Sequence, residues 1–538
     1  MLKRGFKIFM YILGSIVVLL ISTQLFLTFY FSNYIKEEIQ KEIATLSGSQ
    51  YKFDVKKLRI NLIPLSVKFT AVTIQPDFLK ASSALTYHAT FGEINLKNLS
   101  ATDFLFNRNL VAFDLKVINP SITIYRNPLI TVKDTIEKNS APKINPKIAN
   151  KLILKKFILT NVKINLYSSF TDTIPTLSSS KNKIVFEDFT IDESARSGLP
   201  FRAKKFDINI KEFDYQLESG LYSMQASDFS ASYSDSVVSF NDVSLLPLYS
   251  KKQFGIEKGE QTDRLKIKVQ ELNLKHINVK SFLESGNCSA RVCELSKLNV
   301  MAYRDKNVTR IEKPVYSPQD LIRKIPFYIN IDSILIDSSF VAYEELAKGA
   351  NKSGEITFNN INATVTGLTN DSLLTSGNRI VEINATALLM NSGKLKTRYA
   401  FPLNTTETRF ECSAVIESFP LNTLNKMLKY NANLIIKEGV SDKLEFSFYA
   451  NEKYSKGKLT FQYHDLKIEL LNKNTNKNNF KEKIKSFAIN TFVLKSSNPR
   501  KNEPVAKGII YYKRNPNRFI FNYTLKSVLS GMKSTLGF

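Results

Sequence analysis

The 538-residue sequence contains no tryptophan and has only three cysteines and three histidines. Three cysteines, Cys288, Cys293 and Cys412, are too few for a disulfide scaffold or a four-thiolate metal site. Cys288 and Cys293 either bridge a tight turn in an oxidising compartment or are two small buried residues. The histidines are far apart in the sequence, so no H-E-x-x-H motif or other closely spaced metal-binding pattern occurs.

Catalytic motifs are also missing. There is no G-x-S-x-G nucleophile elbow and no G-K-[ST] phosphate loop, because Gly393-Lys394 and Gly457-Lys458 are both followed by leucine. Acidic pairs such as Glu344-Glu345 are interpreted as solvated surface. We therefore predict a non-enzymatic protein with no catalytic, cofactor-binding or metal site. The alternative, a membrane-tethered carbohydrate-active enzyme, would need two carboxylates about 5 to 10 Å apart in a cleft.

Glycine (19) and proline (17) are scarce, whereas phenylalanine (38) and tyrosine (23) are plentiful. Aromatic and β-branched residues are enriched in strands, so this balance favours a β-rich fold. A hydrophobic content of 43% is ample for a core and excludes a disordered chain. The length allows roughly two to four domains.

Acidic residues are outnumbered, with 49 Asp and Glu against 75 Lys and Arg, and the net charge is +26. Such an excess favours anionic partners. The basic residues are scattered singly along the predicted strands instead of gathering on one helix or arm, so we expect no nucleic-acid binding. Phospholipid or another anionic lipid is the expected partner. The alternative is that the lysines only keep exposed strands soluble.

One long stretch, Ile8 to Tyr34, has no charged side chain. It exceeds the roughly 20 apolar residues that a bilayer core requires and predicts a membrane-spanning helix over Phe6 to Phe31. Basic residues precede it, whereas basic and acidic residues are mixed after it, so we expect the bulk of the chain to lie across the membrane from the cytoplasm. A cleaved signal peptide is the alternative, but the run is too long and lacks an A-x-A-like site.

After the span the apolar residues change their spacing. Ile35, Ile39 and Ile43 recur every four residues and predict a short amphipathic helix that ends at Gly48. From Tyr51 onwards apolar and polar residues alternate almost to the end of the chain. We predict a mainly β fold: an elongated, curled antiparallel sheet, forming a groove or an open barrel, behind one N-terminal transmembrane helix, with short helices near both ends.

A pattern of strand, polar step and second strand returns loosely and suits a sheet that grows by adding hairpins. It occurs at 157–167, 271–282, 329–343 and 356–368. Longer polar stretches predict loops or domain joints at 133–147, 171–183, 306–318 and 472–483.

Three segments are predicted. Residues 1–35 form a cytoplasmic stub and the transmembrane helix, 36–317 a first β domain, and 318–538 a second β domain, with the boundary near Lys313 to Pro318. The second domain ends in an amphipathic helix whose apolar face is expected to contain Leu525, Val528, Leu529, Met532 and Leu536. This helix lies on a membrane surface or plugs the end of the sheet.

The apolar side of an antiparallel sheet must be covered by a second sheet, by helices or by a ligand. Helical patterning is sparse here, so the sheet either folds over itself or curls into a trough that holds acyl chains. At about 0.8 kcal/mol per buried methylene, one acyl chain gains on the order of 10 kcal/mol before costs. Such a groove works by continuous apolar character and therefore predicts no discrete binding residues.

The opening of the chain, Leu46 to Ile74, resembles that of the AsmA-like family of bacterial envelope proteins, of the type found in Bacteroidetes. Gly48, the basic strand Lys56 to Ile60 and the Pro64-Leu65 step carry this resemblance, and the segments Pro326 to Asp371 and Lys456 to Leu471 are similar to late β segments of the family.

The resemblance implies a single-pass anchor in the inner, cytoplasmic membrane and a periplasmic β groove that passes phospholipid towards the outer membrane. An outer-membrane protein is a further expected partner. A structural or assembly factor that binds outer-membrane proteins through free sheet edges is the alternative.

Overall fold

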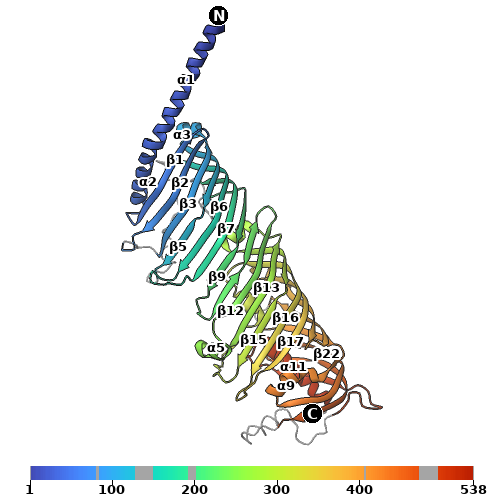
Figure 1. Cartoon of the computed structure of the whole chain (residues 1–538). Helices are drawn as coiled ribbons and strands as arrows, with labels where there is room; N and C mark the ends of the chain where they lie inside the picture. The colour runs from blue at the N-terminus through green and yellow to red at the C-terminus, as the bar shows by residue number, and fades with distance from the viewer. Residues whose placement is uncertain are drawn as a thin grey trace. The chain divides into compact units, whose positions relative to one another are not determined.

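The computed structural model describes residues 2–79, 84–127, 150–191, 201–404, 407–471 and 495–536. The loops predicted at 133–147 and 472–483 lie outside these residues. The fold is mainly β, and its 24 strands are assigned to one sheet behind an N-terminal apolar helix (Figure 1). The predicted fold class is therefore confirmed.

The N-terminal helix consists of three consecutive parts. α1 spans Leu2–Phe26, a π-helical turn, η1, spans Leu27–Phe31, and α2 spans Ser32–Leu46. The stretch Ser15–Thr45 is long and apolar enough to cross a membrane. The predicted amphipathic helix is therefore α2, which continues the apolar helix and ends just before Gly48.

The strands and helices form two compact units. Unit 1 contains residues 1–216 and 225–236, and unit 2 contains residues 217–224 and 237–538. The boundary predicted near Lys313 to Pro318 lies within unit 2, where Ser317 caps the next helix together with Asp320.

Unit 1 contains ten strands and the short helix α3, Ala101–Asn107. The strands are β1 Tyr51–Leu62, β2 Leu65–Pro76, β3 Leu85–Leu99, β4 Asn109–Ile118, β5 Ser121–Arg126, β6 Lys151–Tyr167, β7 Leu177–Ile191, β8 Lys205–Ile210, β9 Glu212–Gln216 and β11 Asp228–Ser232. A further short strand, β10 Tyr222–Ala226, has residues in both units.

Unit 2 contains the remaining strands and most of the short helices. Its strands are β12 Val237–Pro247, β13 Asp263–Lys275, β14 Cys288–Ser296, β15 Asn299–Asp305, β16 Ile329–Leu346, β17 Gly354–Thr369, β18 Ile380–Leu389, β19 Gly393–Pro402, β20 Phe410–Ile416, β21 Phe419–Pro420, β22 Leu434–Ala450, β23 Tyr454–Leu470 and β24 Lys507–Lys513. Its helices are α5 Lys251–Lys258, α6 Val279–Ser285, α7 Pro318–Arg323, α8 Ser372–Thr375, η2 Leu421–Leu424, α9 Asn425–Asn431 and α11 Ile520–Leu536.

Most neighbouring strands are antiparallel, but each unit contains one parallel step. In unit 1, β4 and β5 together pair with β3 in the antiparallel sense and with β6 in the parallel sense. In unit 2, β14 and β15 have the same relation to β13 and β16. Parallel pairing requires a long connection, which in unit 2 is the segment 306–328 with α7.

The predicted polar steps within the repeated pattern are bulges, not turns. Asn161, Ser338 and Asn360 each adopt a positive φ, and the strand pairing shifts register there. Each strand therefore bends and continues, and β6, β16 and β17 are single long strands. The pattern at 271–282 was also predicted as two strands, but its second half begins α6.

The C-terminal helix α11 packs on the sheet. Of the two predicted arrangements, a helix on a membrane surface or a helix that plugs the sheet, the structure shows the second. It packs on β23 and β24 with Tyr523, Val528 and Gly531 buried. A Cβ atom on Gly531 would lie 2.8 Å from Cγ1 of Ile510, so this glycine allows the close approach. The predicted apolar face is wrong at Leu525, which is 54% exposed.

Candidate functional site

The sheet of unit 1 has a continuous apolar face. Cross-strand partners share one side of a sheet, so the strand register identifies rows of side chains that run across it. One row contains Ile60, Val67, Leu96, Leu115, Phe157, Phe186 and Phe206. The next contains Leu58, Phe69, Ile94, Val117, Leu159, Ile184, Ile208 and Ala231. We call these two rows the unit 1 apolar face.

Most side chains of the unit 1 apolar face are only half-buried, among them Phe69, Ile94 and Leu159. Of the helices described in unit 1, α2 lies along β1, the strand that carries Leu58 and Ile60, and α3 contacts β4 next to its own turn. Phe201, in the segment before β8, packs against Phe186 at one end of the face. Among the described residues the rest of the face is only partly covered, and an apolar face of this extent marks an interaction surface.

Unit 2 has a similar face on its first strands. One row contains Phe240, Leu272, Leu295 and Ile336, and another contains Leu245, Ile267, Val300 and Val341. All eight side chains are half-buried.

The same face becomes a closed core in the second half of unit 2. There the rows continue through β18 to β24, and their large side chains, including Phe410, Phe448 and Leu459, are buried. Tyr523 and Val528 of α11, Leu428 of α9 and other helical residues complete this cluster. Helices therefore cover the apolar face at the C-terminal end.

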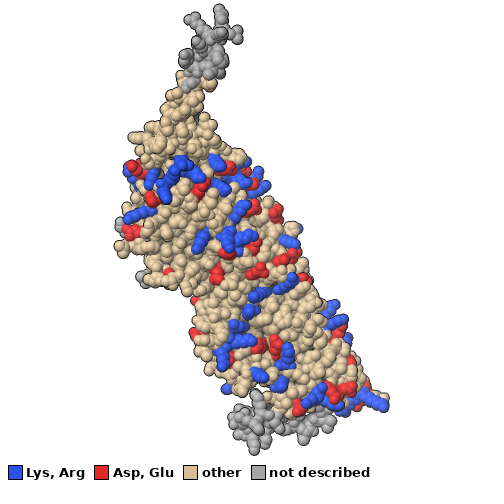
Figure 2. Space-filling view, in the orientation of Figure 1, with Lys and Arg blue, Asp and Glu red and all other residues tan. Residues whose placement is uncertain are grey.

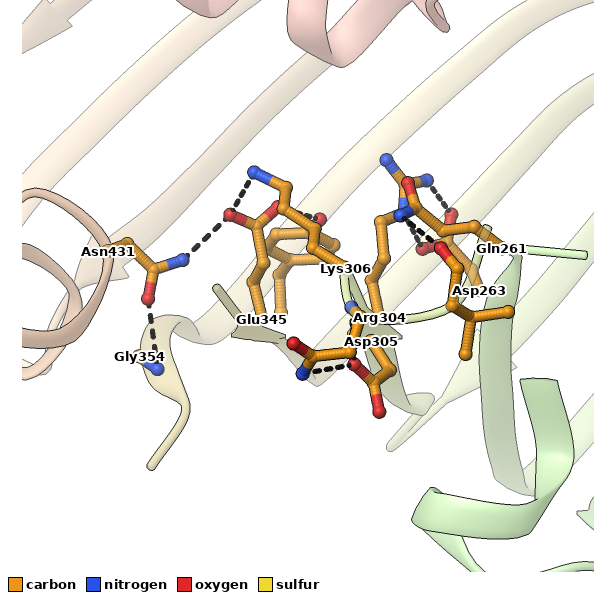
Figure 3. A network of polar contacts seen from close by, with 11 residues as sticks. Gln261, Asp263, Arg304, Asp305, Lys306, Glu345, Gly354 and Asn431 are labelled. Atoms are coloured by element: carbon orange, nitrogen blue, oxygen red, sulfur yellow. Dashed lines mark hydrogen bonds and ion pairs between the residues drawn. The ribbon is translucent and has the colours of Figure 1, made fainter. Parts of the chain in front are cut away.

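A row of charged side chains bounds the apolar face of unit 2. Asp263, Arg304, Glu345 and Gly354 are successive cross-strand partners on β13, β15, β16 and β17 (Figure 3). Nε of Arg304 donates to Oδ1 of Asp263 over 2.8 Å, and Nη2 donates to Oδ2 over 2.5 Å. Fork-to-fork pairing of this kind fixes both side chains.

Glu345 is the centre of the second half of this row. Its carboxylate accepts hydrogen bonds from Nζ of Lys306, from the Tyr343 hydroxyl over 2.9 Å and from Nδ2 of Asn431 over 2.7 Å (Figure 3). Because Asn431 also accepts from the backbone N–H of Gly354, this cluster joins α9 to the sheet.

The pKa values around this row follow from burial. Burial lowers the pKa of Arg304, but the adjacent Asp263 carboxylate more than offsets this and leaves that pKa raised. Burial, together with the Glu345 charge, raises the pKa of Tyr343 far above its ordinary value. These charged side chains pair with one another, so the row stabilises the structure at the limit of the unit 2 apolar face.

We expect Glu345→Ala to lower the free energy of unfolding of unit 2 by about 2 to 3 kcal/mol. Removing one partner of a buried pair costs about 3 to 5 kcal/mol, and the partly exposed Lys306 reduces this. Hydrogen exchange of peptides from β16 and α9 measures the loss. Glu417→Ala is the control, because the Glu417–Lys394 pair is exposed and its removal should leave exchange unchanged.

A hollow of about 840 Å³ spans β16 to β23 in unit 2. Most of its lining side chains belong to the outer, polar side of the sheet, including Asn384, Lys396, Arg398, Glu445 and Lys458. Arg398 is paired with Glu382 and Glu411. The lining also includes Ile336 of the unit 2 apolar rows and Phe446 and Leu459 of the C-terminal core, so this hollow adjoins the apolar rows.

The three cysteines are free and buried. Cys288 and Cys293 are therefore two small buried residues and do not form a disulfide bridge. Burial raises the pKa of Cys293 to about 11 and that of Cys412 to about 12, which makes both thiols unreactive at neutral pH. Within the described residues, no group of three or more His, Cys, Asp or Glu side chains could hold a metal ion. The absence of enzymatic activity stays a prediction.

Helical side chains occupy the outer edges of β1 and β24. On β1, the Gln24 side chain accepts from the N–H of Leu62 over 2.9 Å and donates to the carbonyl of Ile60 over 2.7 Å. On β24, the N–H groups of Ile509 and Tyr511 donate to serine hydroxyls of α11. These contacts oppose strand addition at the two edges.

Lysine and arginine side chains are spread over both units and are interspersed with acidic ones (Figure 2). Many form surface pairs, such as Lys155 with Asp188 and Lys211 with Asp228, each at 2.7 Å. This distribution matches the scatter expected from the sequence.

Sequence reasoning did not identify the Gln24 contact, the charged row or the closure by α11. Ile208 and Ile267, two apolar positions in alternating stretches of the sequence, lie in half-buried rows. Phe446, in a third alternating stretch, is 9% exposed and belongs to the closed core.

The fold and the apolar rows define a class: a mainly β protein with a candidate membrane-spanning helix and a partly uncovered apolar sheet face. No protein-family model matches the chain, and no match was found among curated proteins.

Proposed function

We propose that this protein is anchored in the inner membrane of a bacterial envelope, is related to the AsmA-like proteins, and binds or conducts phospholipid along a hydrophobic β groove in the periplasm. The carrying observation is the unit 1 apolar face, which crosses eight strands while most of its side chains remain half-buried. Acyl chains are the expected occupants, because each buried methylene gains about 0.8 kcal/mol.

The proposed polarity of the anchor rests on charge. Basic residues precede the apolar stretch, whereas basic and acidic residues are mixed just after it, so the positive-inside rule supports a periplasmic location for the units. The positive surface of these units suits the anionic headgroups of envelope lipids.

A role in outer-membrane protein assembly through free sheet edges has less support. Strand addition needs unpaired backbone groups, and Gln24 on β1 and the α11 serines on β24 already bond to such groups. The described apolar rows of unit 1, in contrast, keep most of their side chains half-buried.

The test is to purify the full chain from cells in mild detergent and to identify the co-purifying lipids by mass spectrometry. We expect stoichiometric phospholipid with the wild type and a severalfold loss with Ile208→Glu and with Ile267→Glu, because a carboxylate interrupts the apolar rows. Ile256→Glu is the matched control, since Ile256 is 70% exposed on α5. It should retain the lipid.

Folding of each variant is checked by circular dichroism and hydrogen exchange. Variants that remain folded and lose lipid support the proposal. Wild-type protein without phospholipid, or variants that simply unfold, would show that the rows form an ordinary core and would contradict it.

A further inference from the structure

One end of unit 1 exposes large apolar side chains beside α1. Its parts are the β1–β2 turn, where Ile63 is 75% exposed, and α3, where Leu105 and Phe106 are 72% and 82% exposed. We call this end the α3 end; Figure 1 shows α3 at the end of unit 1 from which α1 extends.

The strand register places both parts at the same level. Ile60 pairs with Val67, and Val67 pairs with Leu96, so these three residues form one row. Ile63 lies three residues beyond Ile60, and Leu99 lies three residues beyond Leu96. α3, which begins at Ala101, therefore projects as far as the turn or beyond it.

Gln24 fixes the level of this end relative to the apolar helix. Its amide bonds to Ile60 and Leu62, directly before the turn. Tyr30 and the neighbouring Phe29, both 70% exposed, suit the aromatic belt at a membrane surface. Six residues separate Gln24 from Tyr30, so the turn lies roughly 9 Å deeper than this belt, within the acyl-chain region.

The hydrogen bonds of Gln24 also suit that depth. A strand edge in hydrocarbon cannot leave backbone groups unpaired, and here the Gln24 amide bonds one carbonyl and one N–H as a neighbouring strand would. A glutamine within an apolar helix is itself costly unless it is paired, and both sides of this contact are satisfied.

Exposed basic side chains flank the apolar tips. Arg59 lies next to Ile60 on β1 and Lys97 lies next to Leu96 on β3, whereas Arg108 and Lys151, at the end of α3 and the start of β6, lie as far along unit 1 as the turn or beyond it. The acidic residue of α3, Asp103, accepts a hydrogen bond from the Ser100 hydroxyl at the start of the helix. Long basic side chains beside inserted apolar residues reach lipid phosphates.

We propose that the α3 end of unit 1 is inserted in the bilayer leaflet in which the N-terminal helix ends, so that the unit 1 apolar face begins among the acyl chains. The occupant is the phospholipid bilayer itself. This inference rests on the proposed membrane anchor and not on the identity of the transported lipid.

The absence of tryptophan allows a direct test, because a single introduced tryptophan is the only one in the chain. The full chain is reconstituted in phosphatidylcholine–phosphatidylglycerol vesicles that contain lipid brominated on its acyl chains. Ile63→Trp and Phe106→Trp report on the α3 end. Ile174→Trp reports on the opposite end of unit 1, and Val18→Trp on the helix; both sites are well exposed, at 67% and 66%.

We expect blue-shifted, strongly quenched emission from Ile63→Trp, Phe106→Trp and Val18→Trp, and red-shifted, unquenched emission from Ile174→Trp. Quenching at Val18 without quenching at Ile63 and Phe106 would overturn the insertion and leave the anchor intact. A lack of quenching at Val18 would overturn both proposals. The four side chains are exposed, so the substitutions do not disturb packing.

Discussion

Phe410→Ala is expected to lower the free energy of unfolding of unit 2 by about 3 to 5 kcal/mol, the usual cost of removing a buried phenylalanine ring. Phe410 is 1% exposed, and its ring centroid lies 5.8 Å from those of Phe401, Phe448 and Tyr523. The cavity left by the ring would separate α11 from the sheet. Hydrogen exchange of peptides from β20, β22 and α11 measures the effect.

Two further alanine variants serve as comparisons for Phe410→Ala: one at an exposed position and one on the unit 1 apolar face. Phe521→Ala, at a 72% exposed position on α11, should leave exchange unchanged. Phe69→Ala, on the half-buried unit 1 apolar face, should cost less, about 2 kcal/mol, because part of its surface is exposed and has no protein partner to lose. Equal losses from Phe410 and Phe69 would mean that unit 1 is as closed as the C-terminal core and would remove the basis for a lipid groove.

The contrast between the two faces explains how the fold serves the proposed function. In the second half of unit 2, helices α9 and α11 close the sheet, and on the earlier strands β13, β15 and β16 the charged row of Asp263, Arg304 and Glu345 bounds the apolar rows. This closed core and paired row stabilise a β structure whose other rows are only half-buried. The proposed groove therefore uses only part of the apolar face that alternation predicts.

The sequence predicted the mainly β fold and the apolar helix because both depend on local patterns. Alternation places Ile208 and Ile267 on one side of a strand whatever that strand pairs with. The bulges were not predictable in this way. Asparagine, the residue type at positions 161 and 360, occurs in turns as well as in bulges. Only pairing with a distant strand decides whether the chain reverses or continues.

The packing of α11 was mispredicted for a related reason. Amphipathic patterning favours large side chains such as Leu525, whereas the observed contact uses Ser527 and Gly531, whose small size allows the helix to approach β24 closely. Likewise, no local signal links Gln24 with Leu62, because the partner lies 38 residues further along the chain. Features that arise from close approach between distant segments need the three-dimensional structure.

Alkaline pH is expected to destabilise unit 2 strongly, starting near pH 9. Cys293 and Cys412 are 6% and 2% exposed, and burial raises their pKa values from 9.0 to about 11 and about 12. Burial likewise raises the pKa of Tyr303 and of Tyr463 to about 12.

The direction follows from proton linkage. A raised pKa in the folded state means that the unfolded chain loses its proton first, so the stabilisation is complete below pH 9 and declines as the pH rises towards 12. Each proton difference contributes about 1.4 kcal/mol per pH unit, so the two thiols alone account for a loss on the order of 5 kcal/mol by pH 11.

Denaturant unfolding of the full chain at pH 8 to 11, followed by exchange in β14 and β20, tests this expectation. Cys293→Ala with Cys412→Ala should flatten the pH dependence between pH 9 and 11, and the tyrosines should account for the remaining slope above pH 10. A double variant with the wild-type slope would show that these thiols do not keep their protons through burial. The burial of Cys293 on β14 and of Cys412 in the closed core would then not account for the alkaline loss.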